Sequence, residues 1–412
     1  MILERLGRRW IRVGDLTVIE GGRSVRFGNG DGPQLVVELS PGAAARIATH
    51  PELRLGEAYM DGSLRMVRGS VYDFLDLVGR NLPYDRNHQR VPAWRRAWFA
   101  ALRQLQQLND RAASRHHVAV HYDLSLDLYR RFLDSDLQYS CAYFERPGMT
   151  LEEAQAAKKA HIARKLLIRP GDRVLDIGCG WGGLGLTLAQ DWGAQVQGVT
   201  LSTEQLATAR TRAEAAGLSG RARFDMIDYR DVPGPFDRIV SVGMFEHVGR
   251  PNFQAYFDRV AELLTDDGVA LIHAIGRKDE PSVTNPWINK YIFPGGYIPA
   301  LSEVLPAIER AGLWVTDLEV LRLHYAETVR CWRDRFAARR AEIVDLYDER
   351  LARMFEFYLA VSEISFRWGG HMVFQVQLTK RVDAAPLTRN YMADPPQAAE
   401  TPGVRALSTA AE

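Results

Sequence analysis

One segment of ten residues, from Val174 to Gly183, constrains the fold of this chain more than any other. A short apolar run that includes Asp176 leads into a glycine-rich turn, and the helical pattern of residues 184–190 comes directly after it. Glycines in such a turn let backbone N–H groups approach a ligand closely at the N-terminus of a helix. The segment therefore predicts a nucleotide-like cofactor at the carboxyl end of a parallel sheet.

The identity of that cofactor depends on the residues after the turn. Gly178, Gly180 and Gly183 satisfy the dinucleotide spacing, but this match alone is a weak signal. A nicotinamide site usually places an acidic residue about 20 residues further on, to hold the ribose hydroxyls. Here the second strand, residues 195–199, ends without one, and the first acidic residue is Glu204.

Asp176 favours a different cofactor. It stands two residues before the first glycine, where a dinucleotide fold keeps an apolar residue, and its carboxylate can accept from the α-amino group of a methionine moiety. The loop resembles the first motif of S-adenosylmethionine-dependent methyltransferases. The alternative is a turn that serves only packing, but five glycines and an acid between Asp176 and Gly185 count against it.

The composition indicates the class of protein and the cellular compartment. With 412 residues, of which 46% are hydrophobic and 25% charged, the chain is long enough for two folded domains. Its three cysteines, Cys141, Cys179 and Cys331, form no closely spaced even set, which favours a reducing cytoplasm. We find no signal peptide at the N-terminus and no uncharged apolar run of 18 residues, so we expect no membrane span.

Charge is distributed unevenly. Residues 1–120 hold 18 arginines and no lysine against 12 acidic residues. Within them, residues 86–115 hold seven arginines and one acid, with tryptophans and leucines spaced along one helical face. Such a helix suits an anionic lipid surface. A helix that packs on its own domain explains the pattern equally well, and nucleic-acid binding is disfavoured because no nucleic-acid module is present.

Alternating strands and helices begin at Asp172. Strands are predicted near residues 173–177, 195–199, 222–226, 236–242, 268–275, 313–319 and 371–379. The segments 121–141 and 326–367 are predicted to be helical. We therefore expect an α/β fold, a doubly wound Rossmann-like methyltransferase sheet, with a smaller N-terminal α+β domain. The predicted domains are residues 1–115 (lipid or membrane association), 116–382 (methyltransferase) and 383–412 (a mobile, proline-rich tail).

An ordered set of motifs identifies a family. The segments are Gly56–Gly62, His121–Leu124, Gln138–Phe144, Gly198–Ser202, Phe245–Gly249, Leu271–Gly276 and Tyr291–Gly296. Together they resemble the cyclopropane-fatty-acyl-phospholipid synthases, the family that includes the mycolic acid cyclopropane synthases. The resemblance implies transfer of a methyl group from S-adenosylmethionine to a cis double bond of a phospholipid acyl chain, followed by loss of a proton and ring closure.

The resemblance also implies the site residues. Bicarbonate is the base in this family, and its ligands correspond to Cys141, Glu246, His273, Ile275 and Tyr325. Donors come from the His273 and Tyr325 side chains and from backbone groups at Cys141 and Ile275, whereas Glu246 accepts from the protonated oxygen. The cofactor residues implied are Tyr139, Ser140, Asp176, Gly178, Gly180, Gly182, Thr200, Gln205, Asp228 and Tyr229.

Each of these residues has a simpler explanation. Cys141 could be a small buried hydrophobic residue, Glu246 a helix start, and His273 a hydrogen-bonded core histidine. Tyr325 has a neighbour, His324, that an alignment slip of one residue would select instead. Family members commonly carry a cysteine where this chain has Ser362, and we interpret that position as structural. No metal site is expected, because His116, His117 and His121 lack partners at ligand spacing.

The sequence thus predicts a cytoplasmic enzyme at the inner membrane surface, with a phospholipid and an anionic membrane as partners and no nucleic acid. A homodimer is one alternative for its oligomeric state. Three rival functions stay open at this point: a lipid methyltransferase with a methyl-branched or methylene product, a methyltransferase of soluble small molecules, and an inactive lipid-binding protein.

Overall fold

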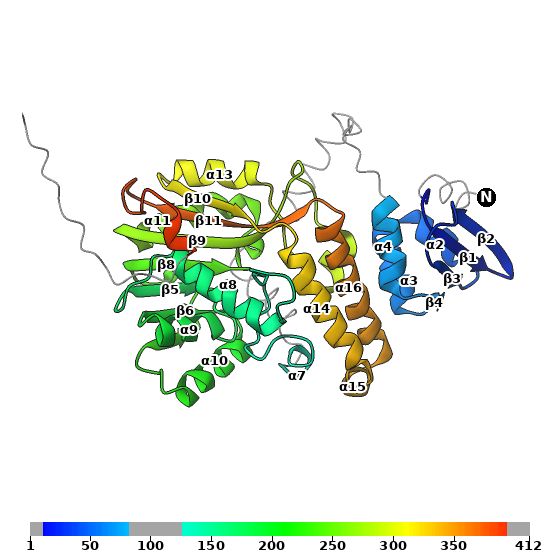
Figure 1. Cartoon of the computed structure of the whole chain (residues 1–412), viewed down its shortest axis with the longest axis horizontal. Helices are drawn as coiled ribbons and strands as arrows, with labels where there is room; N and C mark the ends of the chain where they lie inside the picture. Colours follow the sequence, from blue (N-terminus) through cyan, green and yellow to red (C-terminus); the bar gives the residue numbers. More distant parts are fainter. Residues whose placement is uncertain (1–10, 82–125, 394–412) are drawn as a thin grey trace, which may run out of the picture.

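The larger of two units is built on a seven-stranded sheet (Figure 1). The computed structural model describes residues 11–81 and 126–393. The strands are β5 (Arg173–Ile177), β6 (Gln195–Val199), β7 (Ala222–Asp225), β8 (Phe236–Val242), β9 (Leu264–Arg277), β10 (Trp314–Val320) and β11 (His371–Thr379). Their order is β10-β11-β9-β8-β5-β6-β7, in which β11 is antiparallel to both of its neighbours and the other six strands run in one direction.

Helices cover both faces of this sheet. One face carries α8 (Leu151–Lys165), α9 (Gly183–Asp191) and α10 (Thr203–Ala215), and the other carries α11 (Phe253–Leu263) and α13 (Leu301–Arg310). Side chains alternate across a strand, so Val174 of β5 joins the core under α8 to α10, and Leu175 joins the core under α11 and α13. The predicted doubly wound α/β fold is therefore confirmed.

A smaller unit lies at the N-terminal end of the described chain. Its sheet has the order β2-β1-β3-β4. The elements are β1 (Asp15–Glu20), β2 (Arg23–Gly28), β3 (Gln34–Leu39), α2 (Ala43–Thr49), α3 (Pro51–Met60), β4 (Leu64–Arg68) and α4 (Val71–Asn81). This is the predicted small α+β unit. Its boundary with the larger unit falls between residues 81 and 126, outside the described residues, so the predicted boundary at 115 stays a prediction.

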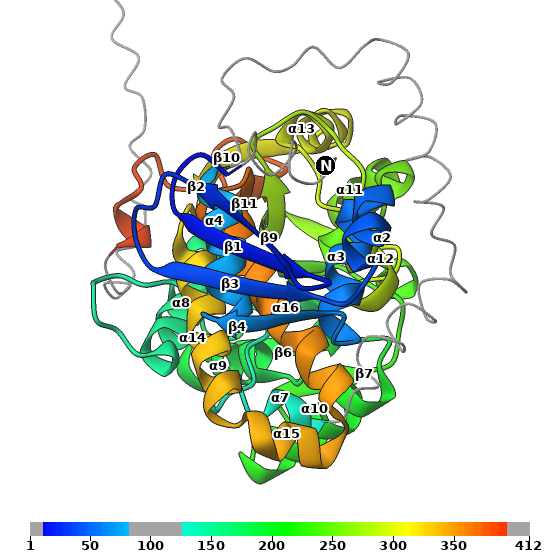
Figure 2. The same cartoon turned by 90° about the vertical axis from the view of Figure 1, so that its right-hand side faces the viewer.

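The two units meet on a long helix, α16 (Glu349–Arg367), and α3 and α4 lie against it (Figure 2). The Tyr72 hydroxyl donates to Oε1 of Glu363 at 2.9 Å, and Trp368 Nε1 donates to Oδ1 of Asp76 at 2.7 Å. Glu363 is fully buried and also pairs with Arg333 and Arg367. The N-terminal unit is thus attached to one side of α16 by hydrogen-bonded, buried polar groups.

The helix predicted over residues 121–141 is wrong in its described part. Only α7 (Leu126–Tyr129) is helical there, and the chain is irregular until α8 begins. Leu137 has φ of 61°, which no α-helix permits. Side chains replace the missing helical hydrogen bonds, because Asp134 accepts from the Gln138 amide and Gln155 donates to the Ser140 carbonyl.

The helix predicted over residues 326–367 is confirmed as three helices, α14 (His324–Ala338), α15 (Arg340–Leu346) and α16. Part of the predicted mobile tail differs from the prediction. Arg389 pairs with Asp317, and the Tyr391 hydroxyl donates to Gln377 at 3.0 Å, so residues up to 393 lie against the larger unit.

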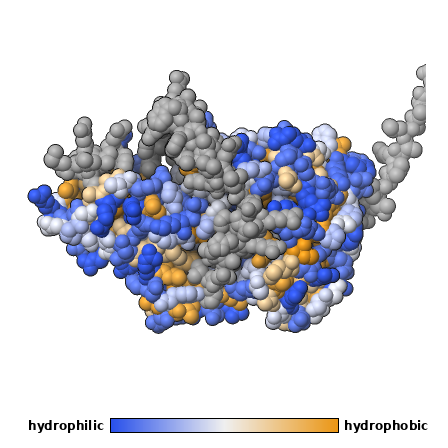
Figure 3. Space-filling view, turned by 180° about the vertical axis from the view of Figure 1, so that it is seen from behind, coloured by the Kyte–Doolittle hydropathy of each residue, from blue (hydrophilic) through white to orange (hydrophobic). Residues whose placement is uncertain are grey.

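The basic segment 86–115 and residues 394–412 lie outside the described residues. Within 11–81 and 126–393, no helix is both long and apolar enough to cross a membrane. Hydrophilic residues predominate over the described part of the face seen in Figure 3, and apolar residues form small groups between them.

Candidate active site

The glycine turn after β5 takes the shape that the sequence predicts. The backbone amides of Gly178 and Cys179 both donate to the Val199 carbonyl, at 2.9 and 3.1 Å, which ties the ends of β5 and β6 together. Gly178 has φ of 81°, and a Cβ there would lie 2.8 Å from the Met244 side chain. Only glycine satisfies both conditions, so the backbone lies open to the space above the sheet.

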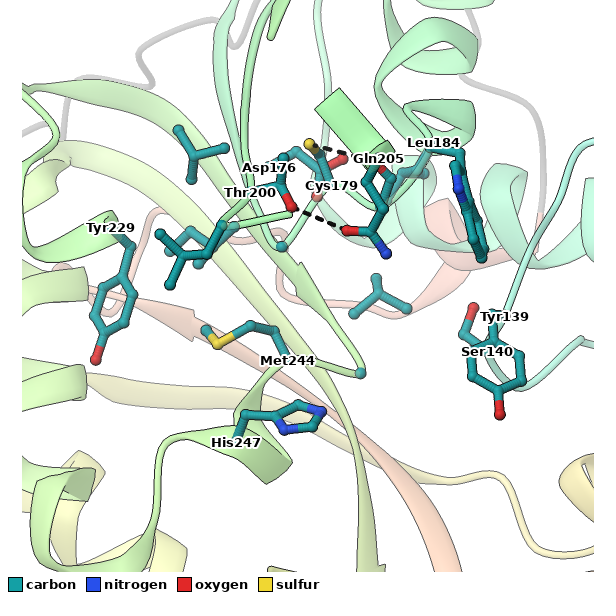
Figure 4. Close-up of a pocket in the computed structure, with 18 of the residues that line it drawn as sticks. Tyr139, Ser140, Asp176, Cys179, Leu184, Thr200, Gln205, Tyr229, Met244 and His247 are labelled. Carbon is teal, nitrogen blue, oxygen red and sulfur yellow. Dashed lines mark hydrogen bonds between the residues drawn. The ribbon is translucent and has the colours of Figure 1, made fainter. Parts of the chain in front are cut away.

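A first cavity lies above these strand ends (Figure 4). Nine of the ten predicted cofactor residues line it: Tyr139, Ser140, Asp176, Gly178, Gly180, Thr200, Gln205, Asp228 and Tyr229. Gly182 does not. It has φ of 84° at the N-cap of α9, and a Cβ there would lie 3.0 Å from Ala209 and Phe224, so its role is in the turn and in helix packing.

Asp176 is the buried anion of the first cavity. Its side chain is 2% exposed, and its Oδ2 has no hydrogen-bond partner among the described residues. Burial raises the pKa of Asp176 to about 7, an effect that the charge of Lys158 opposes. A buried carboxylate without a partner is costly, and a cationic amine would remove that cost. The α-amino group of S-adenosylmethionine fits this position.

Polar and aromatic side chains make up much of the remaining lining of the cavity. The Thr200 hydroxyl donates to Oε1 of Gln205 at 2.9 Å, which leaves the amide nitrogen of Gln205 as a donor (Figure 4). Asp228 is held by Arg230 at 2.5 Å and caps the short helix η1 (Tyr229–Asp231). Tyr229 lies across the cavity from Tyr139 and Ser140. A nucleoside at the Tyr229 end and an amino acid at the Asp176 end would fit this distribution.

A second cavity adjoins the first. Tyr139, Ser140, Gly243 and His247 line both. The rest of its lining is mainly apolar and aromatic and comes from η2 (Phe245–His247), β9, α12 (Pro286–Tyr291), α14, α16, β11 and the loops around Cys141 and residues 284–298. All five residues assigned to the bicarbonate site line it: Cys141, Glu246, His273, Ile275 and Tyr325.

Glu246 is the buried carboxylate of the second cavity. Its Oε1 accepts from the Ile275 amide at 2.6 Å, and its Oε2 has no partner among the described residues. Burial raises the pKa of Glu246 to about 7, although the Ile275 hydrogen bond opposes the shift. The resemblance assigned the Ile275 N–H to bicarbonate; here that group holds Glu246 instead.

His273 is positioned by the neighbouring strand. Gln375 of β11 is paired with it, and the amide Nε2 lies 3.1 Å from its Nδ1. With Gln375 as the donor in this contact, the ring proton is on Nε2. Burial, and then the charge of Lys158, lower the pKa of His273 to about 3, so the ring is neutral at physiological pH. A neutral imidazole N–H can donate to an anion without adding charge to the cavity.

Cys141 and Tyr325 complete the set. Cys141 is 1% exposed, and burial raises the pKa of its thiol, so it is not a thiolate nucleophile. Tyr325 lines the second cavity with its ring 4.6 Å from that of Phe366. His324 accepts from the Phe144 amide and stacks on Tyr143. The geometry therefore favours Tyr325 over His324 as the residue that faces the site.

Sequence reasoning missed residues in both cavities. Lys158 lies behind the first cavity, His247 lines both, and Tyr358 of α16 lines the second with its hydroxyl 2.8 Å from that of Tyr139. Helical periodicity marks Lys158 and Tyr358 only as positions on a helix, so no local signal separates them from core residues. The adjacent glutamate and histidine of η2 do mark His247. Ser362 lines the second cavity.

Within the described residues, no group of three histidine, cysteine or acidic side chains could hold a metal ion. The arrangement instead comprises a cavity with several polar side chains at the carboxyl ends of parallel strands, next to a second cavity that is more apolar. A doubly wound sheet with a carboxylate before the glycine turn is typical of the S-adenosylmethionine-dependent methyltransferases.

Comparisons with known proteins identify the family. A family model described as mycolic acid cyclopropane synthetase matches residues 109–376, more than half of the chain. Cyclopropane-fatty-acyl-phospholipid synthase of Escherichia coli K12 is 37% identical over 374 residues, which cover 91% of this chain and 94% of that protein. The tuberculostearic acid methyltransferase UfaA1 of Mycobacterium tuberculosis is 38% identical over 84% of this chain and 83% of its own. The chain therefore belongs to the cyclopropane synthase family of S-adenosylmethionine-dependent methyltransferases.

Solved structures agree with this assignment. The cyclopropane synthase MmaA2 of M. tuberculosis superposes with a TM-score of 0.62 at 34% identity, covering 66% of this chain and 99% of its own. A coclaurine N-methyltransferase bound to SAH superposes with a TM-score of 0.66 at 22% identity, covering 79% of this chain and 99% of its own. The second likeness shows the fold alone.

Proposed function

We propose that this enzyme converts cis double bonds in phospholipid acyl chains into cyclopropane rings. The observation that carries the proposal is the junction of the two cavities at Tyr139, Ser140, Gly243 and His247. There a cavity with polar groups suited to S-adenosylmethionine adjoins a more apolar cavity suited to an acyl chain. The likeness to relatives named for fatty acids and phospholipids supports the same substrate class.

An alkene is a weak nucleophile, so the reaction needs the methyl donor held in line with the double bond and close to it. Asp176 and Gln205 would fix the cofactor in the first cavity, and Tyr139, which lines both cavities, would lie beside the point where the cofactor meets the acyl chain. S-adenosylmethionine supplies the methyl group, and its transfer leaves a carbocation on the acyl chain. The net change, after loss of one proton, is the gain of one CH2 and the loss of the double bond.

The second cavity is suited to that cation. Its described lining includes the aromatic residues Tyr139, Phe293, Tyr297, Tyr325, Tyr358 and Phe366. Aromatic faces stabilise cations at short range, and the apolar lining excludes water that would otherwise capture the carbocation. Glu246 and His273 then provide the polar groups that a base in this cavity requires.

Bicarbonate, when bound, would supply the base that removes the proton. Glu246 would accept a hydrogen bond from the protonated oxygen of the ion at Oε2, and His273 would donate from Nε2 to an unprotonated oxygen. The raised pKa of Glu246 favours a shared proton over two adjacent anions. The Ile275 amide would act on the ion indirectly, because it holds Oε1 of Glu246.

Lipid mass spectrometry with labelled S-adenosylmethionine and unsaturated phospholipid vesicles tests the proposal. We expect a product that gains one CH2, carries the label and shows ring protons by nuclear magnetic resonance; vesicles of saturated phospholipid are the control and should gain nothing. A product with an exocyclic methylene or a methyl branch would show that the enzyme catalyses another lipid methylation and not cyclopropanation. Turnover of soluble amines without any effect of vesicles would refute a lipid substrate.

We propose further that the arginine-rich segment 86–115 binds the anionic membrane surface that presents the lipid. Replacing three arginines among Arg90, Arg95, Arg96 and Arg103 should weaken vesicle binding strongly and in a salt-sensitive way, since each contributes about 1 kcal/mol near such a surface. The matched control replaces three exposed arginines of the larger unit, Arg169, Arg221 and Arg339. Equal co-sedimentation of both variants would mean that the segment only packs on its own domain.

A further inference from the structure

A buried lysine lies behind the first cavity. Lys158, on α8, is 1% exposed, and its Nζ donates to Oε1 of Gln138 at 2.5 Å and to Oγ of Ser140 at 2.9 Å. Burial lowers its pKa to about 8, against the opposing charges of Asp134 and Asp136. Burying a cation is expensive, and neither direct partner of Nζ is an anion.

The lysine determines which way the Ser140 hydroxyl can donate. An ammonium group only donates, so Ser140 must accept from Lys158 with an oxygen lone pair, and its own proton is directed elsewhere. Among the described residues no acceptor receives that proton. Ser140 lines the first cavity, so its hydroxyl is available to donate to an anionic ligand there.

Electrostatics narrow the identity of that ligand group. The charge of Lys158 opposes the rise of the Asp176 pKa in the first cavity, and it also lowers the pKa of His273 in the second. Asp176 fits the α-amino group of the cofactor, and the carboxylate of the methionine moiety is attached to the same carbon atom. A carboxylate in this buried region needs a donor and a positive charge nearby. Ser140 provides the first and Lys158 the second.

We propose that Lys158 is a positioning residue, which orients the Ser140 hydroxyl toward the carboxylate of S-adenosylmethionine and supplies the charge that this carboxylate requires. The inference rests on the identity of the cofactor and not on the lipid product. We favour the cofactor carboxylate over an anion in the second cavity because both partners of Nζ, Gln138 and Ser140, line the first cavity, whereas only Ser140 lines the second.

Two probes that differ in the amino-acid part test the proposal by calorimetry. S-adenosylhomocysteine carries the carboxylate, and 5′-methylthioadenosine has the same nucleoside without any amino-acid part. We expect Lys158→Met to weaken S-adenosylhomocysteine binding about tenfold or more, in keeping with loss of a charge-assisted contact, and to leave 5′-methylthioadenosine binding unchanged. Ser140→Ala should give the same selectivity, and the double variant should be little worse than the stronger single variant.

Controls separate this role from a structural one. Lys165→Met removes another buried lysine of α8, paired with Asp317 and Glu319 away from both cavities. It should lower the unfolding temperature without changing the ratio of the two affinities. If Lys158→Met does not fold, Lys158→Gln takes its place in the test. Glutamine keeps a hydrogen-bond donor without the charge, so the loss of S-adenosylhomocysteine affinity should be smaller. Equal losses for both probes, or no loss for either, would overturn the proposal. So would unchanged S-adenosylhomocysteine binding with an altered bicarbonate dependence.

Discussion

Each of the two cavities contains one buried carboxylate, Asp176 in the first and Glu246 in the second. The two side chains are similar in burial and pKa, but each suits a different kind of ligand. Asp176 and Glu246 are both nearly inaccessible, and each keeps one oxygen without a partner among the described residues. Burial raises the pKa of each to about 7. Their neighbours differ, because the charge of Lys158 acts directly on Asp176, whereas Glu246 accepts from the Ile275 amide and shares its cavity with a neutral His273.

The difference explains how similar groups can have distinct roles. In the first cavity a cationic ligand would stabilise the charged form of Asp176, so that residue contributes binding energy. In the second cavity an anionic ligand would favour a proton shared with Glu246, so that residue contributes to proton transfer. We therefore assign cofactor affinity to Asp176 and turnover to Glu246, and variants should separate the two.

The largest effect is expected for Glu246→Gln. The amide keeps the size of the side chain but cannot act as an anionic acceptor that orients a protonated base. Removing one preorganised electrostatic partner typically costs about a hundredfold to a thousandfold in rate. Steady-state kinetics should show that loss in kcat, while calorimetry shows near-normal S-adenosylhomocysteine affinity. A loss of affinity equal to the loss in kcat would break the division between the two carboxylates.

Asp176→Ala should have the reverse signature. The α-amino group loses its charged acceptor, worth about 1.5–3 kcal/mol, which corresponds to about a tenfold to hundredfold weaker affinity. The methyl-transfer rate at saturating cofactor should fall less than the affinity does. Unchanged affinity in a calorimetric titration would refute the assignment of Asp176.

The pH dependence of binding distinguishes the same two groups. With its pKa raised to about 7 by burial, Asp176 holds a proton in the free protein below that pH and must lose it to bind a cation. Affinity for S-adenosylhomocysteine should therefore fall as the pH drops below about 7, approaching tenfold per pH unit. Glu246→Gln should keep this dependence and Asp176→Asn should abolish it. If the pH dependence of affinity were lost only in Glu246→Gln, Glu246 and not Asp176 would be the carboxylate that binds the cofactor.

The smallest effect is expected at Ser362, where family members commonly carry cysteine. It lines the second cavity, but the proposed reaction needs no covalent intermediate. Ser362→Ala and Ser362→Cys should both stay within about threefold of the wild-type rate, as expected for a surface that only contacts the acyl chain. A large gain in Ser362→Cys would show that this position takes part in the chemistry.

The sequence predicted the first cavity better than the second for a physical reason. The glycine turn, Thr200 and Asp228 come after parallel strands, and the ends of such strands meet at one edge of a sheet. The parallel fold, Asp176 and the glycine turn could therefore be inferred from local patterns, whereas the other cofactor residues were implied by the family resemblance. Gly182 was assigned to the same cavity because a motif does not distinguish glycines that face a ligand from those that shape the turn.

The second cavity is assembled from segments far apart in the chain. Glu246, His273 and Tyr325 could be selected only through the family resemblance, because each also has an ordinary structural explanation. Lys158 and Gln375 act through other side chains, which no spacing reveals. The irregular segment before α8 was mistaken for a helix because its hydrogen bonds are made by side chains such as Gln155, which lie elsewhere in the sequence.

Bicarbonate dependence is the sharpest test of the proposed base and of the role of Glu246. Turnover of unsaturated phospholipid vesicles should be measured in carbonate-depleted buffer and again after bicarbonate is restored, for the wild type and for Glu246→Gln. We expect that depletion slows the wild type, that added bicarbonate restores its rate, and that the variant stays slow in both conditions. Normal turnover by Glu246→Gln in carbonate-free buffer would rule out bicarbonate held by Glu246 and require another base in the second cavity.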